Sequence, residues 1–132
     1  LEAMRGLFGF VPNLGVAMAA SPAALGGYLA SLQALDGAEG LTPIERQLVM
    51  IAASRANEAA YGVAVHSTLA LKLGASETLV AGAAGDQEGG ADQRVAALLQ
   101  FTTALTRDRG RVAAQELEAV LNAGYGSASL VE

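Results

Sequence analysis

The sequence contains no cysteine and no tryptophan, a single histidine and few charged residues. Without cysteine the chain can form neither a disulfide nor a thiolate metal site, and no thiol redox chemistry is open to it. Charged residues make up 16% of the 132 residues, and the net charge is −5. Nucleic-acid-binding domains usually carry a basic face. We therefore predict no nucleic-acid partner, no metal site and no cofactor.

Apolar residues, in contrast, make up 52% of the chain. A domain of this size has a large surface relative to its volume, and that surface needs polar cover. The excess of apolar residues therefore predicts a homo-oligomer, either a dimer, a trimer or a hexamer. The length predicts one domain over residues 1–132. Nothing in the composition requires secretion, so we predict a cytoplasmic protein.

The longest uncharged stretch runs from Gly6 to Leu35 and is long enough to suggest a membrane span. Turn-forming residues interrupt it at Pro12-Asn13, Ser21-Pro22 and Gly26-Gly27. The stretch therefore predicts two buried helices joined by a turn, and no membrane partner. We expect Asn13 to cap the first of them and Ser21 to cap the second, whose apolar stripe consists of Leu25, Tyr28, Leu29, Leu32 and Leu35.

The most regular part of the chain lies between Thr42 and Gly74. Thr42 is a good N-cap, Pro43 suits the first helical position, and Glu45 completes a capping box. The apolar spacing predicts that this helix reaches about Ala56.

A second helix of this stretch is expected to begin with Asn57 as its N-cap and to end at Gly74. Together the two helices form a core helical hairpin over residues 43–73. The expected buried stripe of the second helix consists of Ala59, Gly62, Val63, His66, Leu69, Ala70 and Leu73.

The remaining sequence also shows helical spacing throughout, so the fold class is all-α with about six to seven helices and no strands. Ser76, Asp92 and Ser127 are expected to begin helices, and residues 85–90 are expected to form a flexible acidic loop. We interpret the arginines at 107, 109 and 111 as a solvated turn rather than an anion site. In the helix before Gly124 the residues expected to face inward are Ala113, Leu117, Val120 and Leu121.

The central hairpin resembles the core of the AhpD-like alkylhydroperoxidase and carboxymuconolactone decarboxylase superfamily. The shared residues are the E-R-Q-L-V that begins at Glu45, the S-R-A-N that begins at Ser54, and Tyr61, His66 and Leu73-Gly74. The resemblance implies an AhpD-like helical bundle. It also implies a relation to an antioxidant, peroxidase-related branch of that superfamily.

Peroxidase-type members carry the pattern E-x11-C-x2-C-x3-H. In this sequence the glutamate position is Gln47, the vacated redox-cysteine positions are Ala59 and Gly62, and only His66 is retained. A thiol in the first turn of a helix would have a lowered pKa, and glutamate and histidine would move protons. An amide such as that of Gln47 cannot act as acid or base. Thiol peroxidase activity is therefore excluded for this chain.

His66 and Gln47 are the catalytic candidates. For His66 a hydrogen-bonded core residue remains an alternative, and Gln47 is expected to be its structural hydrogen-bond partner. Tyr61, Arg55 and Glu58 are candidates to line a pocket, although Tyr61 could equally pack in the core or at an oligomer contact. The space beside the vacated positions could hold a small anionic or carboxylated ligand near free backbone N–H groups, or a neighbour could fill it.

Three functions are compatible with these residues. The first is a redox-silent oligomeric scaffold or small-ligand binder. The second is a non-redox enzyme of the carboxymuconolactone decarboxylase type, in which His66 would act as general acid or base on a carboxylated lactone. The third is a peroxidase that uses cysteines supplied elsewhere, for which the chain offers no feature.

Overall fold

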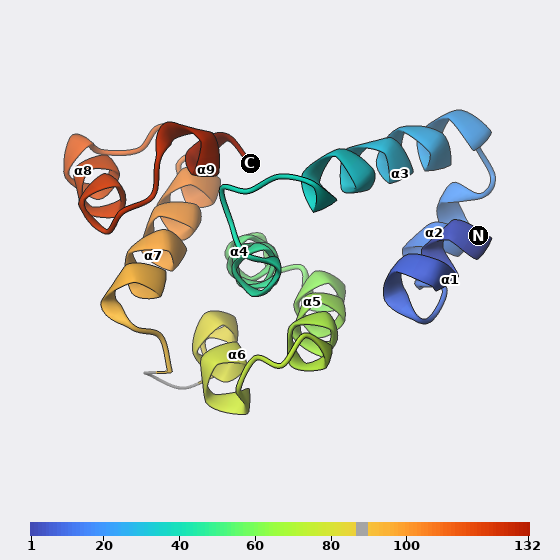
Figure 1. The fold of residues 1–132 in the computed structure, drawn as a ribbon, viewed down its shortest axis with the longest axis horizontal. Coiled ribbons are helices and arrows are strands. Elements are labelled where there is room, and N and C mark those ends of the chain that lie inside the picture. The colour runs from blue at the N-terminus through green and yellow to red at the C-terminus, as the bar shows by residue number, and fades with distance from the viewer. Residues whose placement is uncertain (87–89) are drawn as a thin grey trace. The chain divides into compact units, whose positions relative to one another are not determined.

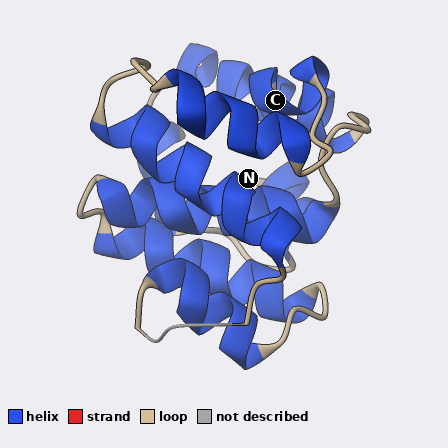
Figure 2. Cartoon of the chain, turned by 90° about the vertical axis from the view of Figure 1, so that its left-hand side faces the viewer, coloured by secondary structure: helices blue, strands red, loops and turns tan. Residues whose placement is uncertain are grey.

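A computed structural model describes residues 1–86 and 90–132. These residues form nine α-helices and no strand, which confirms the all-α class (Figure 2). Seven of these helices are at least seven residues long. Their bounds are α1 Glu2–Phe8, α2 Asn13–Met18, α3 Pro22–Asp36, α4 Pro43–Ala56, α5 Ala60–Lys72, α6 Glu77–Ala84, α7 Gln93–Arg107, α8 Ala114–Asn122 and α9 Ser127–Val131.

The chain divides into two compact units, residues 1–38 with α1 to α3 and residues 39–132 with α4 to α9. The single domain over residues 1–132 stays a prediction. No helix in the described part of the chain is both long and apolar enough to cross a membrane.

In the first unit Met4 is fully buried and lies against Gly15, where a side chain would collide with its sulfur. Ser21 accepts a hydrogen bond from the Ala24 N–H at 3.3 Å, so the predicted cap of α3 is confirmed. The predicted cap of α2 is wrong, because Pro12 holds the N-cap position and Asn13 is already helical.

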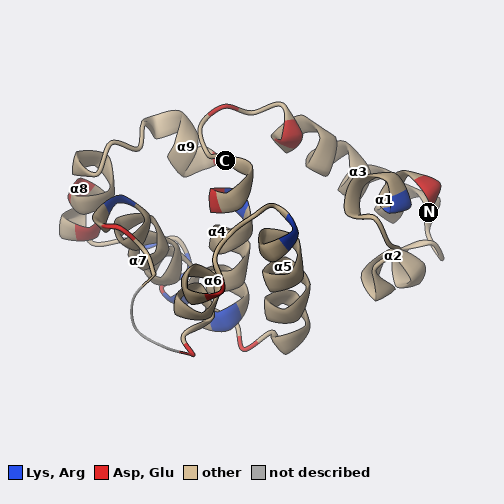
Figure 3. Ribbon diagram, turned by 60° about the horizontal axis from the view of Figure 1, so that its bottom comes forward, with Lys and Arg blue, Asp and Glu red and all other residues tan. Residues whose placement is uncertain are grey.

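The prediction that the two helices of this segment are buried is wrong. In α2 only Gly15 is buried, whereas Leu14 and Val16 are exposed. The departure is larger for α3. None of its 15 residues is buried, and Leu35 is 37% exposed. Residues 1–38 contain only two other helices, of seven and six residues, and these offer too little surface to cover it. Figure 3 shows that α3 is also nearly free of charge, because Asp36 is its only Asp, Glu, Lys or Arg residue.

Within residues 39–132, α4 occupies the centre and is seen end-on between α5 and α7 in Figure 1. Leu48 and Ile51 on α4 are fully buried in a core that includes α5 and α6. The predicted capping box is confirmed, since Thr42 Oγ1 accepts from Glu45 N at 3.2 Å and Glu45 accepts from Thr42 N at 2.8 Å. The helical hairpin predicted over residues 43–73 is thus present as α4 and α5.

The turn inside this hairpin differs from the prediction that Asn57 caps the second helix. The Asn57 N–H still donates to Ala53 O at 3.1 Å, so this residue completes the last turn of α4. Glu58 then takes a left-handed conformation with φ 55°, and Ala59 becomes the N-cap of α5.

The predicted buried stripe of α5 is only partly present. Leu69 and Ala70 are buried and Val63 is half-buried, whereas Ala59 and Leu73 are exposed. These two residues flank the helix rather than belong to it, and after Leu73 the chain turns away through Gly74 at φ 94°.

The predicted starts of α6, α7 and α9 are confirmed. Ser76 accepts from Leu79 N at 3.2 Å, Asp92 accepts from Val95 N at 2.8 Å, and α9 begins at Ser127. Residues 87–89 of the predicted acidic loop lie outside the described residues.

Only one of the four residues expected to face inward around α8 is buried. Val120 is fully buried, whereas Ala113, Leu117 and Leu121 are exposed. The prediction is wrong for these three because α8 packs chiefly against one neighbouring helix, α7, and therefore buries only a narrow strip of its own surface.

The segment before α4 is held to α9 by polar contacts. The Glu132 carboxylate accepts from the N–H groups of Gly40 at 3.0 Å and Leu41 at 3.2 Å, and Ser129 Oγ donates to Gly40 O at 2.8 Å. These contacts fix the start of the helix that carries Gln47.

Candidate functional site

The two catalytic candidates lie side by side. His66 on α5 and Gln47 on α4 are joined by a hydrogen bond of 2.9 Å between Nδ1 and Oε1, so the expected pairing is present. An amide oxygen only accepts hydrogen bonds. With the amide in this orientation, Nδ1 carries the proton and Nε2 carries the lone pair. The imidazole is half-buried.

Burial also controls the charge of His66. Desolvation lowers the pKa of His66 below its ordinary value of 6.5. A carboxylate at position 47 would act in the opposite direction, but the amide of Gln47 carries no charge. The pair is therefore neutral at neutral pH.

The two vacated cysteine positions lie at the start of α5. A Cβ built on Gly62 would be 4.0 Å from the Ala59 Cβ, within the range spanned by disulfides. The same Cβ would collide with the Ser54 hydroxyl and lie 3.0 Å from the Ser54 Cβ. Ser54 therefore fills the space next to Gly62, and the predicted alternative of a filling neighbour holds at this position.

A shallow depression of about 380 Å³ does lie at the junction of the hairpin. Three predicted residues line it, namely Arg55, Glu58 and Ala59. Its remaining lining residues are Ala60, Val63 and Ala64. His66, Gly62 and Tyr61 do not belong to this lining, and Tyr61 is 46% exposed.

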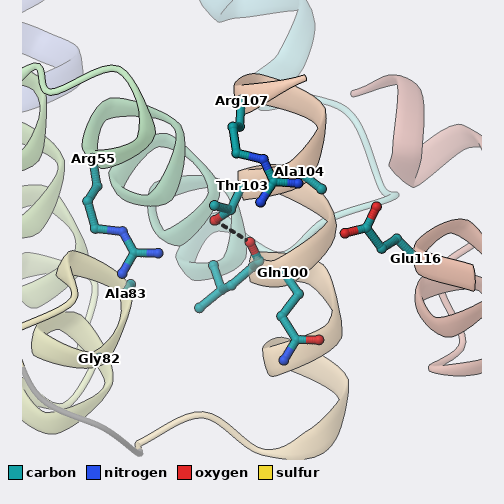
Figure 4. A pocket seen from close by; sticks show the side chains of 9 residues that line it. Arg55, Gly82, Ala83, Gln100, Thr103, Ala104, Arg107 and Glu116 are labelled. Carbon is teal, nitrogen blue, oxygen red and sulfur yellow. Dashed lines mark hydrogen bonds between the residues drawn. The ribbon is translucent and has the colours of Figure 1, made fainter. Parts of the chain in front are cut away.

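A second pocket, of about 330 Å³, lies between α4, α6, α7 and α8 (Figure 4). Of the residues predicted for the site, only Arg55 lines it. The other lining residues are Gly82, Ala83, Leu99, Gln100, Thr103, Ala104, Arg107 and Glu116. Nothing in the sequence pattern brings these positions together, because they come from four helices.

The most elaborate polar cluster was not predicted as a site. Buried Glu45 accepts a 2.6 Å hydrogen bond from Tyr125 Oη and forms an ion pair with Arg94, whose guanidinium lies 4.0 Å from the centre of the Tyr125 ring. Sequence analysis assigned Glu45 only to a capping box, and no local signal connects it to residues 49 and 80 positions away.

Electrostatics within this cluster favour an ionised Glu45. Burial by itself would raise the pKa of Glu45, but hydrogen bonds from Tyr125 and Thr42 and the charge of Arg94 together lower it. Burial, followed by the hydrogen bond to Glu45, raises the pKa of Tyr125 well above its usual value of 10. The cluster joins α4, α7 and the segment after α8.

No group of three or more His, Asp or Glu side chains that could hold a metal ion occurs in residues 1–86 and 90–132. The ionisable groups among the predicted pocket and catalytic residues that the structure places are His66 beside Gln47, and Arg55 and Glu58 in the depression.

The fold and the site together define an all-α protein built on a helical hairpin. In this hairpin His66 lies one helical turn beyond Gly62, which in turn lies close to Ala59. The sequence profile of the carboxymuconolactone decarboxylase family matches residues 19–104, and the chain belongs to this family. No curated protein gives a significant match to the sequence.

Proposed function

We propose that this protein is a redox-silent member of the carboxymuconolactone decarboxylase family that serves as an oligomeric scaffold or small-ligand binder. The observation that carries the proposal is the neutral pair of His66 and Gln47 beside Ala59 and Gly62. Thiol peroxidase chemistry needs a thiolate and a group that moves protons. Neither an alanine nor a glycine supplies the first, and an amide does not supply the second.

The backbone geometry supports a loss of chemistry rather than a loss of fold. Positions 59 and 62 remain within disulfide distance, and the histidine remains one turn further along α5. We infer that the hairpin is kept for packing and for binding. A small anionic or carboxylated molecule is the ligand class we propose, because Arg55 lines both pockets of the hairpin region.

The test is a hydroperoxide assay with a dithiol or lipoyl-type reductant. We expect no consumption above the protein-free rate. The matched variant carries the triple change Gln47→Glu, Ala59→Cys and Gly62→Cys in a Ser54→Ala background, which frees the space beside position 62. We expect it to form a disulfide and to gain measurable turnover. Consumption by the unaltered chain would refute the redox-silent function. A triple variant that forms no disulfide would instead refute the assignment of the two cysteine positions.

One observation favours a second function, a non-redox enzyme in which His66 is the general acid or base. The lowered pKa keeps the imidazole neutral, and Nε2 makes no hydrogen bond within the described part of the chain. A neutral imidazole with a free lone pair can accept a proton from a substrate. Turnover of a carboxylated lactone must then collapse in His66→Ala. Equal turnover by this variant would rule the second function out.

A further inference from the structure

The pocket between α4, α6, α7 and α8 has two chemically different sides. Ala83, Leu99 and Ala104 supply apolar surface, and Ala83 and Ala104 are almost fully buried. Arg55 and Gln100 supply polar groups (Figure 4). Its volume of about 330 Å³ falls at the small end of ligand pockets. All of its lining residues belong to residues 39–132.

The charged side chains of this pocket differ in whether they have a hydrogen-bond or ion-pair partner. Arg107 Nε donates to Asp108 Oδ1 at 2.9 Å and Nη2 donates to Oδ2 at 2.5 Å, so one carboxylate occupies this guanidinium fork. Glu116 accepts from the Ala113 N–H at 3.2 Å as the cap of α8. The Arg55 guanidinium makes no hydrogen bond or ion pair with a residue that the structure describes. Among the described residues, the Arg55 guanidinium is therefore the cation of the pocket wall that has no carboxylate partner, and Glu116 is a carboxylate of the same lining that is bonded only to a backbone N–H.

We propose that this pocket binds a small monocarboxylate with an apolar body, and that Arg55 is the anchor of the carboxylate. The proposal deepens the ligand-binding function above and rests on it. A planar guanidinium matches a carboxylate through two parallel hydrogen bonds. The apolar body of the ligand lies against Leu99, Ala83 and Ala104, and one unpaired guanidinium selects one negative charge.

Arg55 also lies against a second element, the C-terminal end of α6. Its effect on the stability of that helix must be distinguished from its effect on ligand binding. A side chain at Gly85 would collide with its guanidinium, so Arg55 lies beside the C-terminal end of α6. A cation at that end interacts favourably with the helix carbonyls. Lysine would keep this charge but would lose the planar fork. Arg55→Lys therefore separates helix stabilisation from carboxylate binding.

The probe is benzoate, with benzamide as its uncharged counterpart and inorganic phosphate as a general anion. Binding is measured on the full chain by calorimetry and by the ligand-induced rise in Tm. We expect benzoate to bind with a Kd on the order of 1 mM and to raise Tm with its concentration. Benzamide and phosphate are expected to bind at least about tenfold more weakly, because each lacks either the charge or the apolar body.

Two kinds of variant then locate the site. Arg55→Gln and Arg55→Lys are expected to weaken benzoate about tenfold or more, while Arg55→Lys keeps the Tm of the unliganded chain. Thr103→Phe fills the pocket from α7, where the Thr103 hydroxyl donates to Leu99 O of its own helix and to no other described residue. The matched control is Ala64→Phe, which fills the other depression from an exposed position of α5.

Loss of benzoate binding in Thr103→Phe with retention in Ala64→Phe supports the proposal. The reverse result overturns it and places the ligand in the α5 depression. It is also overturned if Arg55→Lys binds like the parent chain, or if benzoate does not bind the parent chain. None of these outcomes bears on the hydroperoxide assay, so failure of this inference and failure of the redox-silent function are distinguishable.

Discussion

Gln47 is nearly the same size as a glutamate, yet its neutral amide determines how the neighbouring imidazole titrates. Burial lowers the pKa of His66, and the amide offers no charge to oppose this effect. We predict that Gln47→Glu raises the pKa of His66 above that of the parent chain, because the carboxylate stabilises the imidazolium.

Since His66 is the only histidine, its ring resonances can be assigned without ambiguity in an NMR titration. Glu58→Gln is the control, because it alters an exposed carboxyl close to the hairpin turn and should leave the titration nearly unchanged. An unchanged pKa in Gln47→Glu would contradict the observed pairing of the two side chains.

A second prediction at this scale concerns Glu45 and Tyr125. The folded-state pKa of Glu45 is below its usual value of 4.5, so the ionised carboxyl contributes stability that is present above pH 4.5. This contribution is lost as the pH falls through the folded-state pKa. Tyr125→Phe removes the 2.6 Å hydrogen bond and raises that pKa. We expect a loss of about 1–3 kcal/mol at pH 7.

Urea unfolding at neutral and acidic pH checks this prediction. The difference between the parent and Tyr125→Phe should shrink as the pH falls below the folded-state pKa of Glu45, because the carboxyl is then protonated in both proteins. Tyr61→Phe, at a position that is 46% exposed, is the control and should cost less. A difference independent of pH would show that Tyr125 acts through packing alone.

At the scale of helices, the contact of α4 with the start of α5 depends on Gly62. An added methyl group would meet the Ser54 side chain. Gly→Ala normally stabilises a helix interior by about 1 kcal/mol, but overpacking costs about 1–3 kcal/mol. We therefore predict that Gly62→Ala lowers the free energy of unfolding by about 1 kcal/mol, and that adding Ser54→Ala recovers part of the loss.

A double-mutant cycle measured by chemical denaturation tests this coupling. Gly26→Ala in α3 provides the control, because nothing lies within 4 Å of a Cβ at that glycine. It should stabilise the chain by roughly 0.5–1 kcal/mol. Additive effects of Ser54→Ala and Gly62→Ala would show that the two side chains do not share this space.

Helices and most of their caps were predictable because they depend on neighbouring residues. Thr42, Ser76 and Asp92 each accept from a backbone N–H three residues later. The role of Asn57 was not predictable, because the choice between ending α4 and starting α5 depends on how the two helices pack.

Which residues are buried, and which distant residues meet in a polar cluster or a pocket, depends on contacts between residues far apart in the sequence. These features could therefore not be predicted from the sequence. The cluster of Glu45, Arg94 and Tyr125 spans 80 positions, and the pocket between α4, α6, α7 and α8 is assembled from four helices. The pairing of His66 with Gln47 could be expected because the family pattern places both near one point. Exposure of Leu117 and Leu121 could not be foreseen, since it depends on how few helices contact α8.

For the whole molecule, the composition still predicts self-association. The chain is 52% apolar, and α3 contains no buried residue and one charged residue. Contact with a second copy of the chain would remove the apolar surface of this helix from water, which favours association. We expect light scattering coupled to size-exclusion chromatography to give two, three or six times the chain mass. A monomeric mass at all concentrations would contradict this prediction, and the cytoplasmic location stays a prediction as well.

The position of Ser54 beside Gly62 also restricts the order in which the two thiols of the family pattern could be introduced into this chain. A cysteine restored first at position 62 would meet an occupied space, whereas one restored at the exposed position 59 would not. The least obstructed order is therefore a cysteine at position 59, then a smaller residue at position 54, and only then a cysteine at position 62. A single cysteine at position 62 would lower the free energy of unfolding before a second thiol is present to form a disulfide.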